Sequence, residues 1–209
     1  MGYGVMIEIR KYESKDKENL RKICIATSGM PTETEVQRKF LTLMFNDYYS
    51  EAEPENCFVA VNEDDEAVGY IICSSNYDEY NKIFSRFYLP EIKELGAKYY
   101  FMAKTEMLLH GFFKKKYPAH LHIDILDSCQ GQGVGTRLIT ALCEHLKENN
   151  VKGIMLSCGA SNTKAVKFYK KNSFVLIKNI LGSCIMAKKL RYNVYISTAC
   201  VRIFTKGVE

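Results

Sequence analysis

Apolar and polar side chains alternate most regularly over residues 119–125, which read AHLHIDI. Three apolar residues share one side of this stretch, namely Leu121, Ile123 and Ile125. This period of two predicts a half-buried β-strand. After residue 134, apolar residues recur instead at helical spacing, at Leu138, Ile139, Leu142 and Leu146. The pattern therefore predicts a strand, a short turn, and a helix that packs on the sheet by one face.

The first third of the chain contains similar signals. Residues 6–12 alternate and predict a first strand, and Ser14 is an N-cap signal for an amphipathic helix that reaches residue 25. A second helix is expected from about residue 33 to residue 48 or 49. Residues 56–74 contain two apolar runs around the polar turn 62–66 and predict a β-hairpin.

The later part of the chain predicts a helical insertion and more strands. Residues 75–118 are too long for a simple loop, so we expect them to fold as a sub-structure, with one helix around 78–87 and another that starts near Pro90. Residues 154–156 predict a short strand. Two further apolar runs, 174–180 and 183–190, predict a last hairpin that turns at 181–182.

The turn between the predicted strand 119–125 and the helix that contains Leu138 runs from Gln130 to Gly135 and reads QGQGVG. The first N–H groups of a helix lack partners, and glycines admit an anion close to them, so the turn predicts a phosphate cradle. The dinucleotide pattern G-x-G-x-x-G fails, because Thr136 and Leu138 stand where its last glycine would be. The Gly-Lys-Ser/Thr ending of a nucleoside-triphosphate loop is also missing.

Two motifs resemble those of the GCN5-related N-acetyltransferase (GNAT) family. The family's coenzyme A loop follows its fourth strand as Gln/Arg-x-x-Gly-x-Gly/Ala, and Gln130, Gly133 and Gly135 fill its positions. One strand further on, the family has Asn-x-x-Ala-x-x-Phe-Tyr. This second motif is filled in register by Asn162, Ala165, Phe168 and Tyr169. The chain departs from the family at residues 172–174, where Asn-Ser-Phe replaces the usual Gly-Phe.

The resemblance implies an α/β fold, with a mixed, mainly antiparallel sheet that has helices on both faces. It assigns residues 6–190 to the acetyltransferase domain. The insertion 75–118 departs from the family's usual short connection, and we expect it to lie over the acceptor side. The tail 191–209 is left without a role: it suggests one more strand at a sheet edge, a contact in a homodimer, or a frayed appendage.

The resemblance also implies acetyl-CoA as the cofactor and names the residues that would bind it. These are Ile125, Leu126, Gln130, Gly131, Gln132, Gly133, Val134, Gly135, Thr136, Asn162 and Phe168. Main-chain N–H groups near Ile125 and Leu126 would polarise the thioester carbonyl. Asn162 would bind the pantetheine arm or cap the next helix. Nearby cations such as Arg137 and Lys164 would serve the phosphates.

For catalysis, the resemblance implies that Tyr169 protonates the departing coenzyme A sulfur. The family often takes its general base from the strand before the phosphate loop. His122 and Asp124 share one face of that strand, so either could accept the proton, and Asp124 could orient His122. Both could instead be ordinary polar residues of a solvated sheet face.

Composition limits the other possibilities. The net charge of +5 is uneven, because residues 1–109 have 13 Lys and Arg against 19 Asp and Glu, whereas residues 110–190 have 13 against 4. The acidic first half suits a cationic amine. No nucleic-acid motif accompanies the basic segment. The eight cysteines form no Cys-x-x-Cys pair, so we expect core thiols in a reducing compartment and no metal site.

These observations together predict transfer of an acetyl group from acetyl-CoA to a primary amine of a small molecule, by direct attack in a ternary complex. A protein lysine or N-terminal acetyltransferase and a non-catalytic acyl-CoA sensor are the alternatives. No apolar run approaches the ~20 residues of a membrane span, and the first residues lack a secretory signal, so we expect a cytoplasmic protein without a membrane partner.

Overall fold

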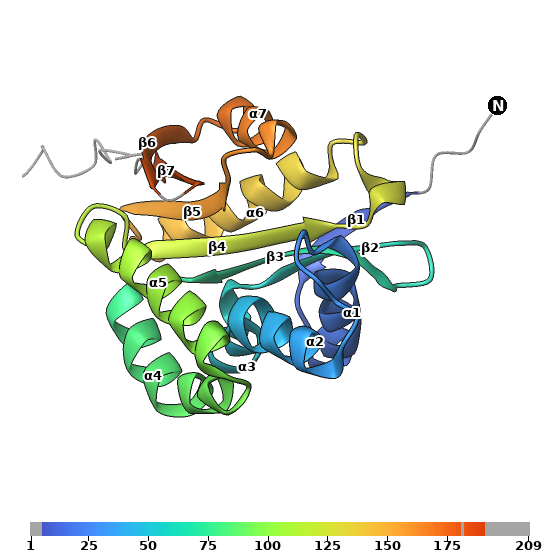
Figure 1. Cartoon of the computed structure of the whole chain (residues 1–209). Coiled ribbons are helices and arrows are strands. Elements are labelled where there is room, and N and C mark those ends of the chain that lie inside the picture. Colours follow the sequence, from blue (N-terminus) through green and yellow to red (C-terminus); the bar gives the residue numbers. More distant parts are fainter. Residues whose placement is uncertain (1–5, 181, 191–209) are drawn as a thin grey trace, which may run out of the picture.

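A computed structural model describes residues 6–180 and 182–190, so the predictions for the tail 191–209 lie outside the described residues. The described strands form one seven-stranded sheet in the order β1-β2-β3-β4-β5-β7-β6 (Figure 1). Their bounds are β1 Glu8–Lys11, β2 Phe58–Val61, β3 Ala67–Ser74, β4 Ala119–Ile125, β5 Gly153–Gly159, β6 Val175–Ile180 and β7 Ser183–Lys189. Only β4 and β5 pair in parallel; all other neighbours are antiparallel. The predicted fold class is confirmed.

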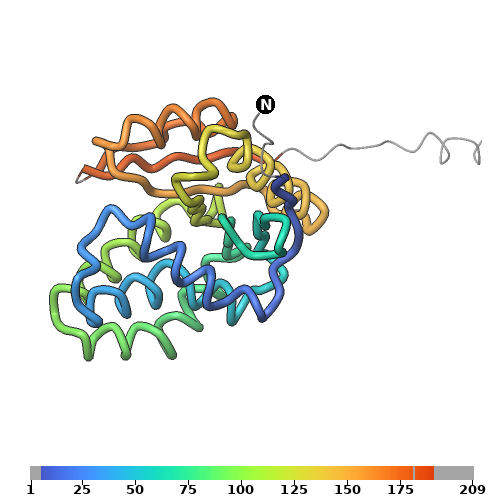
Figure 2. Tube along the Cα trace, turned by 90° about the vertical axis from the view of Figure 1, so that its right-hand side faces the viewer, coloured from blue at the N-terminus to red at the C-terminus, as the bar shows by residue number. Residues whose placement is uncertain are grey.

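Helices cover both faces of this sheet (Figures 1 and 2). One face carries α1 Lys17–Thr27, α2 Glu35–Thr42, α3 Tyr48–Ala52, α4 Tyr77–Glu94 and α5 Ala97–Phe113. The other face carries α6 Val134–Glu148 and α7 Thr163–Lys171. The apolar side of α6, with Leu138, Leu142 and Leu146 fully buried, packs in the same core as Leu121 of β4. The alternation seen in the sequence therefore sends the apolar residues of β4 toward α6.

The second predicted helix is interrupted by a π-helical turn, Leu43–Asp47, between α2 and α3. A turn of this kind widens the helix by one residue and re-aims the side chains next to it. Here Phe45 and Tyr49 pack edge-on against the His122 ring of β4, at centroid distances of 5.3 and 5.1 Å. The turn thus brings two aromatic side chains onto the polar face of β4.

The predicted break at Pro90 is wrong. The first helix of the insertion, α4, continues through Pro90 to Glu94, and the chain turns instead at Gly96, whose φ is +128°. Proline inside a helix removes one hydrogen bond and costs about 3 kcal/mol. Burial of Leu89 and Ile92 against the large core offsets this cost, so packing outweighs the local signal.

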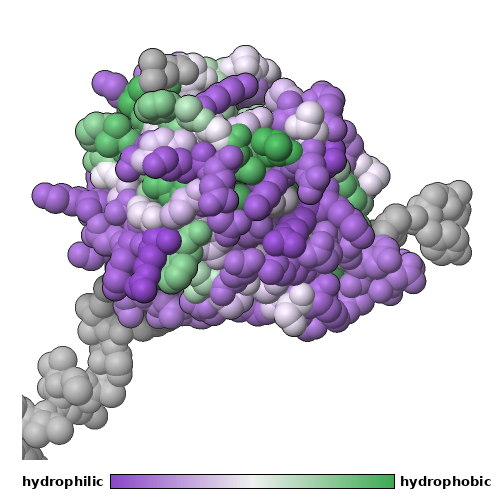
Figure 3. All heavy atoms as spheres, turned by 60° about the horizontal axis from the view of Figure 1, so that its bottom comes forward, coloured by the Kyte–Doolittle hydropathy of each residue, from purple (hydrophilic) through white to green (hydrophobic). Residues whose placement is uncertain are grey.

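The outer surface of the helical side is mainly hydrophilic, with scattered hydrophobic side chains (Figure 3). Within residues 6–180 and 182–190, no helix combines the length and the apolar character that a membrane span requires.

Candidate active site

The parallel strands β4 and β5 part soon after they begin. Their pairing consists of Ala119 with Ile154 and His120 with Met155. Beyond these pairs, β4 follows β3 to Ile125, and β5 follows β7 to Gly159. A gap therefore opens between the carboxyl ends of the two strands, on the side from which the phosphate loop and α6 begin.

The glycine loop leaves a row of main-chain N–H groups free. Gly133 precedes α6 with φ +78° and ψ 0°, a conformation that glycine adopts without strain. The first amide of this segment with a main-chain acceptor is that of Arg137, which donates to the Gly133 carbonyl (3.1 Å). Among the described residues, the N–H groups of residues 131–136 have no protein acceptor. This is the arrangement that an anion requires at a helix start.

The side chain of Gln130 holds the loop in place. Its Nε2 donates to the Ile125 carbonyl (3.0 Å) and to Asp127 Oδ1 (2.8 Å), and its Oε1 accepts from Lys164 Nζ (2.7 Å). Gln130 thus ties the end of β4 to the start of α7, which is a structural role that the motif alone did not reveal.

The two sequence motifs meet at Gly135. A Cβ atom on Gly135 would stand 2.8 Å from the Phe168 ring, so the absence of a side chain lets α6 and α7 approach closely. Asn162 accepts a hydrogen bond from the Ala165 N–H (3.0 Å) and is the N-cap of α7. The predicted capping role of Asn162 is therefore present in this structure.

A pocket of about 440 Å³ occupies the gap and extends over the glycine loop. Most residues predicted from the motifs line it: Asp124, Ile125, Gln130, Gly131, Gly133, Val134, Gly135, Thr136, Asn162, Phe168 and Tyr169. The predicted phosphate-binding cation Lys164 and the neighbouring Lys171 also line it, as do four residues without a predicted role: Thr27, Ile123, Cys129 and Cys158. His122, Leu126 and Gln132 do not line it.

The end of β4 leaves one of the two predicted carbonyl-polarising amides available. The Leu126 N–H donates to the Val68 carbonyl (3.0 Å), so the sheet already uses this amide. Successive residues of a strand point their N–H groups to opposite edges, so the Ile125 N–H points toward the gap. Only Ile125 keeps the geometry that the prediction requires.

Tyr169 lines the pocket with only 8% of its surface exposed. Burial raises the pKa of its hydroxyl above the ordinary value, and the nearby Asp124 and Cys158 raise it further. The hydroxyl is therefore protonated at neutral pH and available as a donor.

The two candidate bases have different partners. His122 and His120 each place Nε2 3.0 Å from the Tyr49 hydroxyl, and burial lowers the pKa of His122 to about 4. Asp124 Oδ2 instead accepts from the Tyr70 hydroxyl (2.5 Å), and burial raises the pKa of Asp124. Tyr49 rather than Asp124 therefore holds the His122 ring. Both tyrosines come from distant parts of the chain, and no sequence signal singled them out.

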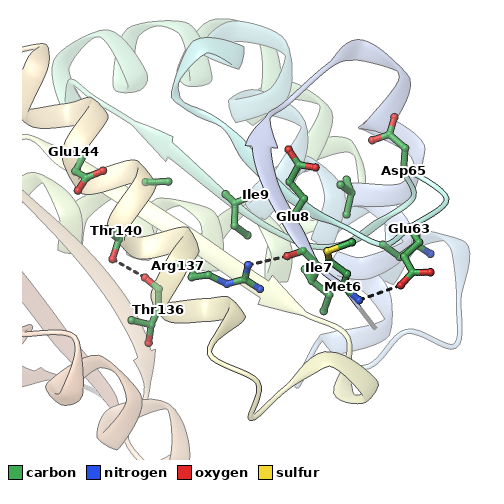
Figure 4. A pocket seen from close by; sticks show the side chains of 13 residues that line it. Met6, Ile7, Glu8, Ile9, Glu63, Asp65, Thr136, Arg137, Thr140 and Glu144 are labelled. Atoms are coloured by element: carbon green, nitrogen blue, oxygen red, sulfur yellow. Dashed lines mark hydrogen bonds between the residues drawn. The ribbon is translucent and has the colours of Figure 1, made fainter. Parts of the chain in front are cut away.

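A second and larger cavity, about 1040 Å³, lies between β1 and α6 (Figure 4). It shares Thr136 with the first pocket but contains neither Tyr169 nor the glycines. Arg137 lines it and donates from Nη1 to the Ile7 carbonyl (2.7 Å). This hydrogen bond ties α6 to the residue before the edge strand β1. The Arg137 side chain therefore has a structural role here, besides the predicted role of binding the phosphates.

The sheet that opens between β4 and β5, together with the free amides before α6, defines an acyl-CoA N-acyltransferase fold. The sequence profile of the Acetyltransferase (GNAT) family matches residues 25–174, and the protein belongs to this family. Its predicted family is confirmed.

Solved structures of similar fold include SsHAT, with 24% identity and a TM-score of 0.78 over 88% of this chain and 98% of that chain. An agmatine N-acetyltransferase has 15% identity and a TM-score of 0.59 over 88% and 99% of the two chains. A polyamine N-acetyltransferase from Drosophila melanogaster has 15% identity and a TM-score of 0.60 over 88% and 100%. At these identities the likeness concerns the fold alone.

Proposed function

We propose that the protein transfers the acetyl group of acetyl-CoA to a primary amine of a small molecule, by direct attack in a ternary complex. The observation that carries this proposal is a single pocket that joins the free N–H groups before α6 to the Tyr169 hydroxyl. The first can hold a diphosphate, and the second can protonate a departing thiolate.

The residues present fit the cofactor. Acetyl-CoA, when bound, supplies an activated acetyl thioester. The amides of residues 131–136 would hold its diphosphate, with Lys164 close by, and Asn162 and Phe168 would border the pantetheine arm. The Ile125 N–H would polarise the carbonyl. Burial raises the pKa of Cys158 to about 11, so the Cys158 thiol stays protonated, which favours direct attack over an acyl-enzyme route through this cysteine.

The amine must lose a proton before it attacks. For a lysine-like amine with a pKa of about 10.4, keeping the neutral form at pH 7 costs roughly 4.6 kcal/mol. Asp124 lines the pocket and His122 does not, so we assign proton removal to Asp124, with His122 as the alternative. Burial raises the pKa of Asp124, which makes this carboxylate a better base than an exposed one.

We therefore expect Asp124→Asn to lower kcat about a hundredfold, within the usual range for a general base, while the acetyl-CoA Kd stays unchanged. Because the base acts when deprotonated, wild-type kcat/KM should fall as the pH drops through the Asp124 pKa, and the variant should lack that limb. The control is His122→Gln, for which we expect less than a tenfold loss. The reverse ranking of the two variants would assign the base to His122. Steady-state kinetics and calorimetry measure both quantities.

A small acceptor is favoured by neighbours of the same fold that are named for agmatine and polyamines. The insertion helix α5 also reaches β5 next to the gap, through the hydrogen bond from Ser157 to Glu106. The test is a panel of amines, amino sugars and lysine peptides with acetyl-CoA, with release of the free thiol as the signal. Preference for peptides would favour a protein acetyltransferase. Binding of acetyl-CoA without transfer to any amine would favour the sensor.

A further inference from the structure

Glu106 is a carboxylate of the insertion helix α5 that contacts β5 on the helical side of the sheet, beyond the residues that line the 440 Å³ pocket. Its Oε1 accepts a hydrogen bond from Ser157 Oγ on β5 and lies 3.3 Å from His110 Nε2. The side chain is 18% exposed. Within the described residues, Oε2 accepts no hydrogen bond, and it is not among the atoms that are sealed from solvent.

Three carboxylates of the helical side that are buried more deeply than Glu106 have several partners each. Asp16 pairs with Arg10 (2.7 Å) and Asp47 with Arg21 (2.8 Å). Glu53 accepts from two hydroxyls, an amide and a main-chain N–H.

In the described part of the chain, no Lys or Arg forms an ion pair with Glu106. Asp124 accepts from the Tyr70 hydroxyl and, like Glu106, pairs with no Lys or Arg in the described structure. The one basic side chain in contact with Glu106 in the described structure is His110, which is charged only when it is protonated. A partly buried carboxylate without a permanent cation is costly, and a cationic ligand would offset that cost.

Two further observations indicate a ligand here. Burial alone would raise the pKa of Glu106, but its contacts with His110 and Ser157 lower it to about 2, so the group is ionised. His110 is only 2% exposed, and while its Nε2 lies beside Glu106, its Nδ1 has no hydrogen-bond partner in the described structure. Buried polar atoms normally have partners, so this corner of the fold has unused capacity for a polar ligand.

The strands give the spacing between Glu106 and the reaction centre. If the β4–β5 register continued, Ser157 would stand beside His122 and Gly159 beside Asp124. A Cβ atom on Gly159 would meet nothing closer than 3.9 Å, so β5 leaves space on its own side of the gap at this level. Glu106 contacts Ser157, and Asp124 would stand beside Gly159, two residues further along β5. The offset between the two carboxylates along the strand direction is therefore roughly 7 Å.

Building on the proposed function, we propose that Glu106 determines specificity for a diamine-like acceptor. One amine would react near Asp124, and the second, as an ammonium group, would bind the free oxygen of Glu106, which lies roughly 7 Å further along the strand direction. The insertion would thereby contribute a residue that binds the acceptor. A monoamine of equal length would leave the Glu106 carboxylate without a cation and would bind more weakly.

The experiment compares diaminobutane and diaminopentane with butylamine and pentylamine, for the wild type and for Glu106→Gln. Glutamine keeps the size of the side chain and its acceptor for Ser157. We expect the substitution to lower kcat/KM for the diamines roughly 10- to 100-fold, mainly through KM, because a charge-assisted hydrogen bond is lost. The monoamines should change by less than about twofold. The matched control is Glu94→Gln, an exposed glutamate on α4 of the same insertion.

Three results would overturn the proposal: a wild type without preference for diamines, an equal loss with both amine classes, or the same loss in Glu94→Gln. The Tm and the acetyl-CoA Kd of Glu106→Gln should match the wild type. Should that variant not fold, Glu106→Asp keeps the charge, and its diamine preference should persist while KM rises. Failure of the proposed function looks different, because then no amine of the panel releases thiol.

Discussion

Replacing Gly133 by valine is expected to weaken acetyl-CoA binding roughly a hundredfold, which corresponds to about 3 kcal/mol. Gly133 has φ +78°, where a β-branched residue is strongly disfavoured. The loop would relax to another backbone conformation, and the amides of Val134 to Thr136 would no longer converge. Contacts of this kind are worth about 0.3–1 kcal/mol each, and up to about 2 when partly buried, so losing three of them accounts for the effect. Titration calorimetry measures the Kd.

Gly96→Val is the control for this substitution. Gly96 also has a positive φ, at +128°, and a Cβ atom there would meet nothing within 4 Å. It lies between α4 and α5, outside the pocket, so valine there should lower the Tm without changing the Kd. Unchanged acetyl-CoA binding in Gly133→Val would contradict the phosphate cradle, and the proposed transfer reaction would lose its main support.

The sheet and the family could be predicted because their signals are local. Alternation over residues 119–125 and helical spacing from Leu138 to Leu146 each come from a single element, and the two motifs keep their register within one strand–helix unit. Such patterns can be recognised within one segment of the sequence, because they do not depend on which other segments pack against it. The mixed sheet with helices on both faces followed from them through the family.

Long-range packing decided what the sequence could not show. Pro90 predicted a helix boundary, but burial of its neighbours Leu89 and Ile92 outweighed the lost hydrogen bond. The contact of Tyr49 with His122 spans 73 residues and that of Tyr70 with Asp124 spans 54, so neither had a local signal. The pKa directions of the candidate bases depend on the same burial. The residues of the site remain predictions until variants are measured.

Replacing Tyr169 by phenylalanine is expected to lower kcat about a thousandfold, within the range of general acid catalysis, and to leave the acetyl-CoA Kd within about twofold. The ring remains, so its packing against Phe168 and Phe174 is kept, and only the hydroxyl is lost. Without a proton donor, the sulfur must depart as a thiolate next to the buried Tyr169 ring, where an unpaired charge is costly. Stopped-flow measurement of thiol release gives the rate of the transfer step.

The pH dependence separates this role from a merely structural one. Burial and the nearby Asp124 raise the pKa of Tyr169 above its ordinary value of about 10, and an acid acts only while protonated. Wild-type kcat should therefore show no loss from Tyr169 ionisation up to about pH 10. Tyr77→Phe is the control, because it removes a buried hydroxyl that donates to the Met107 carbonyl outside the pocket; it should lower stability and keep kcat. Equal kcat in Tyr169→Phe and the wild type would assign the proton to another donor, whereas an amine panel without any thiol release would favour the non-catalytic alternative.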